Sequence, residues 1–179
     1  MMTRPMAVIA ATLLVFWAAP AGAQEGRPTQ SAFVQGSLNL AAGERATLRR
    51  LDDGSFELVK TERIEFSEVT PPTNATQADA GGLVSARPGT ISFALHLRRD
   101  VGSLLRIENA TSDGLQYVGF IRRVSGGQVS EPARTSTCTV PPGKAVFEHW
   151  QEPVIQVVAA NFSDIAGDMP VCESHDVNE

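Results

Sequence analysis

Apolar side chains recur at every second position along much of this chain, and that period restricts the fold more than any other feature. From Ile91 to Arg98 each odd-numbered residue is a large apolar one. The alternation returns at 105–108 and, less regularly, at 115–122. A period of two is typical of strands that place one face against a core, and no helical stripe of comparable length follows residue 23. The sequence therefore predicts an all-β protein.

Short turns separate the expected strands. Asp52-Asp53-Gly54-Ser55 is a strong hairpin signal, and 111–114 predicts a second tight turn, because Asp and Gly favour the local bonds and positive φ that turns need. The strands expected between such turns are 33–40, 46–51, 56–66, 91–98, 105–108, 115–122, a short one around Cys138, 144–150 and 154–162.

This many short strands with almost no helix indicates an antiparallel two-sheet sandwich of the immunoglobulin-like type. The segment from Leu104 to Phe120 resembles a hairpin of immunoglobulin-like domains, and periplasmic pilus chaperones share its rhythm of strand, Asn, turn and strand. The resemblance implies a fold class and carries no function. A small β-barrel is the alternative architecture.

Val154–Phe162 is the most apolar strand expected beyond residue 23. Strict alternation would place Val157 and Ala159 on the face opposite to Phe162. Because both faces are apolar, we expect this strand to be covered on both sides.

Residues 1–23 have the pattern of an export signal. Arg4 precedes an unbroken apolar run at 7–19, and Pro20 is followed by the small residues that a signal peptidase accepts, ending at Ala23. The run is shorter than the roughly 20 apolar residues of a spanning helix. We therefore expect cleavage after Ala23, no membrane span after cleavage, and a periplasmic or secreted protein.

The remaining chain is expected to form a single β-sandwich domain over 24–172, with a flexible C-terminal tail at 173–179. The stretch 70–89 is rich in Pro, Thr, Ala and Gly and has no apolar period, so it is expected to be a long loop. Loops on rigid scaffolds often carry binding residues, which makes 70–89 the first candidate for a binding site.

Cys138 and Cys172 are the two cysteines of the chain. In an oxidising compartment, such a pair is most simply one disulfide. A metal site is the alternative, because Cys172 and His175 have the two-residue spacing of metal ligands, and Cys138 and His149 could complete a set of four. Our first expectation is a disulfide and no metal or other cofactor.

The remaining sequence points away from common chemistry. It has no G-x-S-x-G elbow, no H-E-x-x-H helix and no phosphate-binding loop. The formal net charge of −5, with no cluster of basic residues larger than a pair, disfavours nucleic acid as a partner. We therefore expect a non-catalytic, exported binding or structural module of the cell envelope that contacts an envelope or extracellular protein. Trp150, as a large aromatic, and Asn74, in the long loop, are its candidate binding residues.

Overall fold

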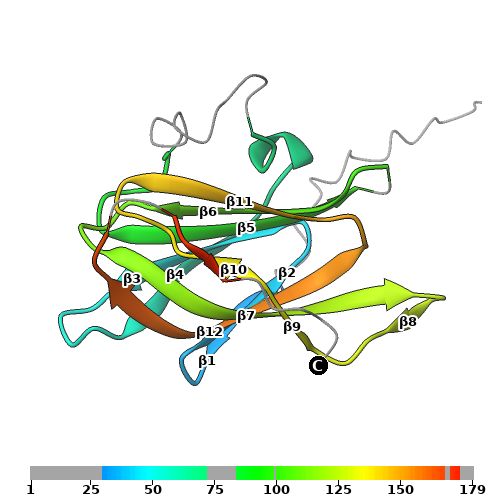
Figure 1. The fold of residues 1–179 in the computed structure, drawn as a ribbon, viewed down its shortest axis with the longest axis horizontal. Helices are drawn as coiled ribbons and strands as arrows, with labels where there is room; N and C mark the ends of the chain where they lie inside the picture. Colours follow the sequence, from blue (N-terminus) through cyan, green and yellow to red (C-terminus); the bar gives the residue numbers. More distant parts are fainter. Residues whose placement is uncertain (1–29, 72–83, 99, 168–169, 174–179) are drawn as a thin grey trace, which may run out of the picture.

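Two antiparallel sheets make up most of the computed structural model, which describes residues 30–71, 84–98, 100–167 and 170–173 (Figure 1). The expected signal peptide at 1–23 and all of the expected tail except Glu173 lie outside these residues. The one helix in the described ranges is the 3-10 turn η1 (Phe66–Glu68), and no helix there has the length and apolarity that crossing a membrane requires.

The first sheet contains the two longest strands. We call it the lower sheet, after its place in Figure 1. Its strands, in spatial order, are β1 (Ala32–Val34), β2 (Ser37–Ala41), β12 (Val154–Ile165), β7 (Gly114–Ser125) and β8 (Gln128–Val129), with β9 (Ala133–Thr135) also paired to β7.

The second sheet, here the upper sheet, lies on the other side of the core. Its order is β11 (Lys144–Trp150), β6 (Gly102–Asn109), β5 (Thr90–Arg98), β3 (Glu44–Arg50) and β4 (Phe56–Arg63). A separate two-stranded ladder joins β10 (Thr137–Cys138) to β13 (Cys172–Glu173).

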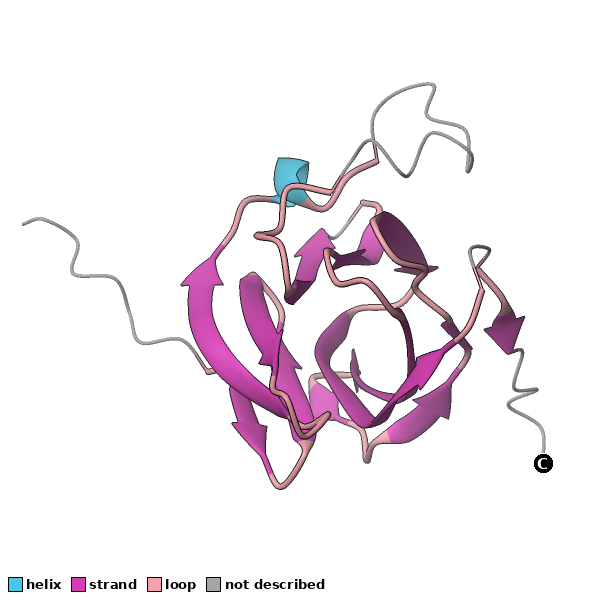
Figure 2. Cartoon of the chain, turned by 90° about the vertical axis from the view of Figure 1, so that its left-hand side faces the viewer, coloured by secondary structure: helices cyan, strands magenta, loops and turns pink. Residues whose placement is uncertain are grey.

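The strand connections confirm the predicted sandwich. β6 pairs with β11 in one sheet and β7 pairs with β12 in the other, so the chain crosses between sheets at both β6–β7 and β11–β12. The same neighbours, B with E and C with F, define the centre of an immunoglobulin-like sandwich. The other edge of β12 pairs with β2, a strand from the N-terminal part of the chain. In an immunoglobulin-like domain, the last strand of the chain lies at that position. One sheet is curled like half of a barrel (Figure 2). This curl is the feature that the structure shares with the alternative prediction of a small β-barrel.

The core lies between the facing sides of the two sheets. Phe93 of β5 meets Tyr117 of β7 edge to face, with ring centroids 5.6 Å apart, and Phe162 of β12 packs 6.0 Å from Phe93. All of the large side chains that are less than 2 % exposed, apart from Glu108 and Val69, belong to this core: Phe93, Leu38, Leu40, Leu48, Ile91, Leu95, Leu105, Ile107, Leu115 and Ile121.

The prediction of strict alternation along β12 is wrong. Val157, Ala159 and Phe162 all pack in the core, although Phe162 was expected on the opposite face. The register with β7 shifts between Val154 and Gln156 and again between Ala160 and Ser163. Each bulge adds an unpaired residue and so moves the following side chains to the other face. The outward side is only partly covered, which corrects the expectation of burial on both faces.

The resemblance of 104–120 to a hairpin also needs correction, because β6 and β7 belong to different sheets and the turn between them is an arch. Asn109, fully buried, ties this arch together. Its Nδ2 donates to the carbonyl oxygens of Asp113 (2.8 Å) and Val140 (2.9 Å). Its Oδ1 accepts hydrogen bonds from the amide and the hydroxyl of Thr111. The side chain thereby replaces backbone partners that a hairpin would have supplied.

The outer side of the upper sheet is not left bare. The segment after β4 packs Ile64, Phe66 and Val69 onto Ala94 and Leu104, forming a second, smaller apolar cluster. Figure 1 shows η1 on the side of β5 and β6 that faces away from the lower sheet. The two ends of the expected loop at 70–89 thus begin and finish on this outer face.

Candidate functional site

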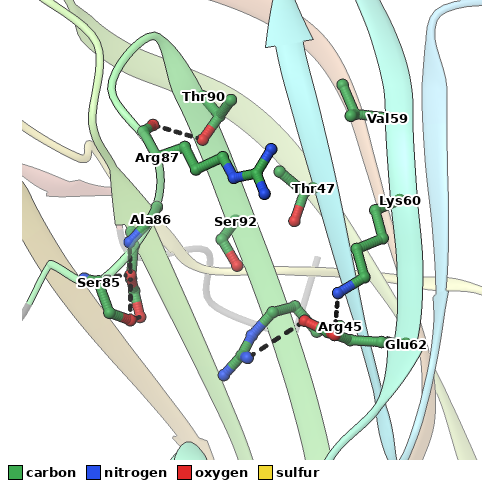
Figure 3. Close-up of a pocket in the computed structure, with 11 residues that line it drawn as sticks. Arg45, Thr47, Val59, Lys60, Glu62, Ser85, Ala86, Arg87, Thr90 and Ser92 are labelled. Carbon is green, nitrogen blue, oxygen red and sulfur yellow. Dashed lines mark hydrogen bonds and ion pairs between the residues drawn. The ribbon is translucent and has the colours of Figure 1, made fainter.

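A cavity of about 350 Å³ lies on the outer face of the upper sheet (Figure 3). Its floor is formed by β3 and β5, one side by β4, and the opposite side by residues 85–87 and Glu108 of β6. The volume falls in the range of about 300–1,000 Å³ that is typical of small-ligand sites. Its lining residues are Arg45, Thr47, Val59, Lys60, Glu62, Ser85, Ala86, Arg87, Thr90, Ser92 and Glu108.

Strand register explains why polar side chains gather here. Lys60 of β4 lies opposite Thr47 of β3, Thr47 lies opposite Ser92 of β5, and Ser92 lies opposite Glu108 of β6. Directly opposed residues in an antiparallel ladder point to the same face. One straight row of four polar residues therefore crosses four strands at the cavity.

A second row, one step along the strands, supplies ion pairs. Arg45 of β3 lies opposite Glu62 of β4 and contacts its carboxylate at 3.4 Å, and it also reaches Glu68 of η1 at 3.1 Å. Lys60 pairs with the same Glu62. The hydrogen bond from Lys60 lowers the pKa of Glu62 below its ordinary value, so Glu62 is ionised at neutral pH. These cations are thus already matched by carboxylates.

Glu108 fixes the wall of the cavity. The side chain is 3 % exposed, and its carboxylate accepts hydrogen bonds of 2.8 Å from the backbone amides of both Ser85 and Ala86. The Ser85 hydroxyl also lies within hydrogen-bond distance, and Arg106 forms an ion pair at 2.7 Å. A buried carboxylate needs such a set of partners. Glu108 therefore anchors the second end of the 70–89 stretch to the sheet.

Arg87 differs from the other cations. Its backbone carbonyl accepts hydrogen bonds from Thr90, while its guanidinium extends over the floor toward Thr47 (Figure 3). Among the described residues, no carboxylate lies within ion-pair distance of this guanidinium. The cavity thus carries one cation without a counter-charge from the described part of the chain.

The two hydroxyls on the floor of the cavity also differ from the other polar groups that line it. Ser92 is 4 % exposed, yet its hydroxyl makes no hydrogen bond to any described residue, and the same is true of Thr47. Figure 3 shows both side chains directed into the cavity. Because both hydroxyls line the cavity, they are available to hydrogen-bond with water or with a ligand there. Together with Arg87, these groups can hold an anion.

The predicted disulfide is present. Cys138 and Cys172 lie directly opposite each other in the β10–β13 ladder and are joined by an S–S bond. Neither sulfur is then a thiolate, which removes two of the four ligands of the metal alternative. His149 is exposed, with Nε2 2.8 Å from the carbonyl oxygen of Val101, and His175 lies outside the described residues. No group of three or more potential ligands (His, Cys, Asp, Glu) is arranged around a common point in the described ranges.

The two candidate binding residues lie away from the cavity or outside the described chain. Trp150 is half-buried against the core, and its indole N–H donates to the Thr135 hydroxyl at 3.0 Å. Its polar atom is therefore already used. Asn74 lies outside the described residues, so its role stays a prediction.

The residues of the cavity carry no sequence motif that marks them as a site. The alternation places Ser92 on the polar face of its strand. The sequence alone does not show which residues of β3, β4 and β6 lie beside Ser92. Arg87 stands in a stretch without periodicity and carries no local signal.

Comparison with known proteins adds no guide to this site: no family model matches the chain, and neither a curated protein nor a solved structure is significantly similar to it.

Proposed function

We propose that this chain is an exported binding module of the cell envelope, which contacts another envelope or extracellular protein through the outer face of its upper sheet. The observation that carries the proposal is the cavity with its uncompensated Arg87 and unpartnered hydroxyls. The Arg87 side chain is exposed, and a ligand that supplies negative charge and acceptors can pair with it and with the two hydroxyls.

Two further features support export. The first 23 residues have the order of cation, apolar run and small residues that signal peptides share. The disulfide between Cys138 and Cys172 fits a compartment outside the reducing cytosol.

Export is tested by expressing the full chain in a bacterial host with an outer membrane. We expect the periplasmic fraction to contain a chain that begins at Gln24 and is lighter than the reduced form by two hydrogens. A full-length chain in the cytosol with two free thiols would refute this half of the proposal.

Partner binding is tested by capture from the native envelope with matched charge reversals. Arg87→Glu changes the cavity, whereas Arg134→Glu makes the same change at an exposed position on β9 of the lower sheet. We expect one protein to be retained by the wild type and by Arg134→Glu and to be lost with Arg87→Glu. Equal retention by all three chains would reject the outer face of the upper sheet as the binding surface.

A further inference from the structure

We infer that the cavity on the upper sheet is a carboxylate-binding site, in which Arg87 supplies the charge and the hydroxyls of Thr47 and Ser92 supply hydrogen bonds. The inference rests on the proposed function insofar as it names the chemical group that a partner would present. The carboxylate could belong to an acidic protein side chain or to a free small acid, and the two sources share the same chemistry.

The balance of charge selects a monoanion. Among the residues that line the cavity, three are cationic and two are acidic: Arg45, Lys60 and Arg87 against Glu62 and Glu108. One carboxylate would neutralise the remaining charge. A phosphate with two negative charges would leave an excess charge close to Glu62 and Glu108, and like charges repel strongly in a partly desolvated site.

The geometry of the donors also suits a carboxylate. An Arg guanidinium forms paired hydrogen bonds with the two oxygens of a carboxylate. Thr47 and Ser92 occupy directly opposed positions on adjacent strands, so their side chains lie side by side beneath that guanidinium. Opposed β-carbons are about 4.5–5.5 Å apart, close enough for both hydroxyls to donate to one bound group.

The walls of the cavity are held in place before any ligand binds. Glu108 anchors Ser85 and Ala86 on one side, and the Arg45–Glu62–Lys60 pairs hold the other. Because these side chains are already ordered, binding a carboxylate costs less conformational entropy than it would on a mobile surface. Only the Arg87 side chain needs to be fixed.

The test uses the disulfide-bonded chain from Gln24 at low salt, titrated with the monoanion propionate and followed by the amide resonances of Thr47, Arg87 and Ser92. Propionamide, which has the same shape and no charge, is the control probe. We expect saturable shifts with propionate, none with propionamide, and a loss of about 10- to 100-fold in affinity for Arg87→Gln, the range for a hydrogen-bonded charge. Ser92→Ala should lose about 2- to 10-fold.

Arg134→Gln on the lower sheet is the matched control and should bind propionate as the wild type does. A second titration with a short blocked peptide of glycine and glutamate tests the source of the group. Binding of either probe that depends on Arg87 supports the site, and tighter binding of the peptide assigns the carboxylate to a protein. Tighter binding of inorganic phosphate, or an equal loss in Arg87→Gln and Arg134→Gln, would overturn the inference.

The two proposals fail in different ways. Propionate binding that depends on Arg87, combined with no captured protein, would leave the carboxylate site intact and remove the protein partner. Capture that depends on Arg87, combined with no binding of either carboxylate probe, would keep the partner and reject the carboxylate.

Discussion

Tyr117 of the lower sheet donates a hydrogen bond of 2.7 Å to the carboxylate of Glu148 in the upper sheet, so a polar contact joins the two layers beside the apolar core. The Cys138 amide donates to the same carboxylate oxygen at 3.3 Å. Burial raises the pKa of Glu148 to about 7, although both hydrogen bonds oppose the rise. Burial and the nearby Glu148 charge also raise the pKa of Tyr117, which keeps its hydroxyl protonated as a donor.

Replacing Glu148 should therefore change how stability depends on pH. The pKa of Glu148 is higher in the folded chain than its ordinary value of 4.5, so between these values the folded state binds more protons and stability falls as pH rises. Glu148→Gln cannot ionise but keeps an oxygen for Tyr117. Relative to the wild type, it should gain about 2.5 kcal/mol between pH 5 and pH 8, at about 1.4 kcal/mol per pKa unit.

Urea unfolding of both proteins at the two pH values measures that gain. Glu131→Gln, at an exposed position between β8 and β9, is the control and should show the same difference from wild type at both pH values. A difference between Glu148→Gln and wild type that stays constant from pH 5 to pH 8 would contradict the assignment of a raised pKa to Glu148.

A second prediction concerns the buried carboxylate that anchors 85–86. Glu108→Gln removes the charge opposite Arg106 and weakens the bonds from the Ser85 and Ala86 amides. Breaking a buried ion pair costs about 3–5 kcal/mol. We expect a loss of about 3 kcal/mol in the free energy of unfolding and faster hydrogen exchange at both amides.

Glu57→Gln serves as the comparison for Glu108→Gln, because Glu57 pairs with Arg49 at the surface of the same sheet. It should cost less than about 1 kcal/mol. Unchanged exchange at Ser85 and Ala86 in Glu108→Gln would show that other contacts hold this segment.

The alternating pattern predicted the class of fold well because burial of one face is a local consequence of strand geometry. Ile91, Phe93 and Leu95 lie in the core as their spacing predicts, and the Asp52–Ser55 turn joins the paired strands β3 and β4. The same rule failed at β12, where two bulges interrupt the period. Bulges depend on the partner strand, which a single strand's sequence does not describe.

The cavity could not be predicted because it depends on register between distant segments. Lys60, Thr47, Ser92 and Glu108 become neighbours only after four strands have paired. The alternation places Ser92 on the polar face of its strand, yet Ser92 is only 4 % exposed, because it lies on the floor of the cavity. The disulfide was predictable, since two cysteines allow one pairing within the chain.

Reducing the disulfide should destabilise the chain measurably. β10 and β13 are two residues each, and the bond closes a separation of 34 residues, for which chain entropy predicts roughly 3.5–4 kcal/mol as an upper value. We expect the melting temperature to fall in a reducing buffer, and the double variant Cys138→Ala, Cys172→Ala to melt at the lower temperature with or without reductant. Equal melting temperatures for wild type in both buffers would argue against a stabilising bond.

Gly102 offers a final prediction, because the start of β6 leaves no room for a side chain. Its φ is +96°, and a β-carbon there would lie 2.2 Å from the carbonyl oxygen of Trp150 on β11. Gly127 also has a positive φ, +80°, but nothing lies within 4 Å of its β-carbon position. Gly127→Ala should therefore cost only the backbone strain, about 1–2 kcal/mol. Gly102→Ala must in addition displace the end of β11, so it should cost clearly more, about 3 kcal/mol or above. Denaturant unfolding of the two variants separates the cost of backbone strain from the cost of displacing β11. Equal losses of unfolding free energy in the two variants would mean that β11 moves aside without cost.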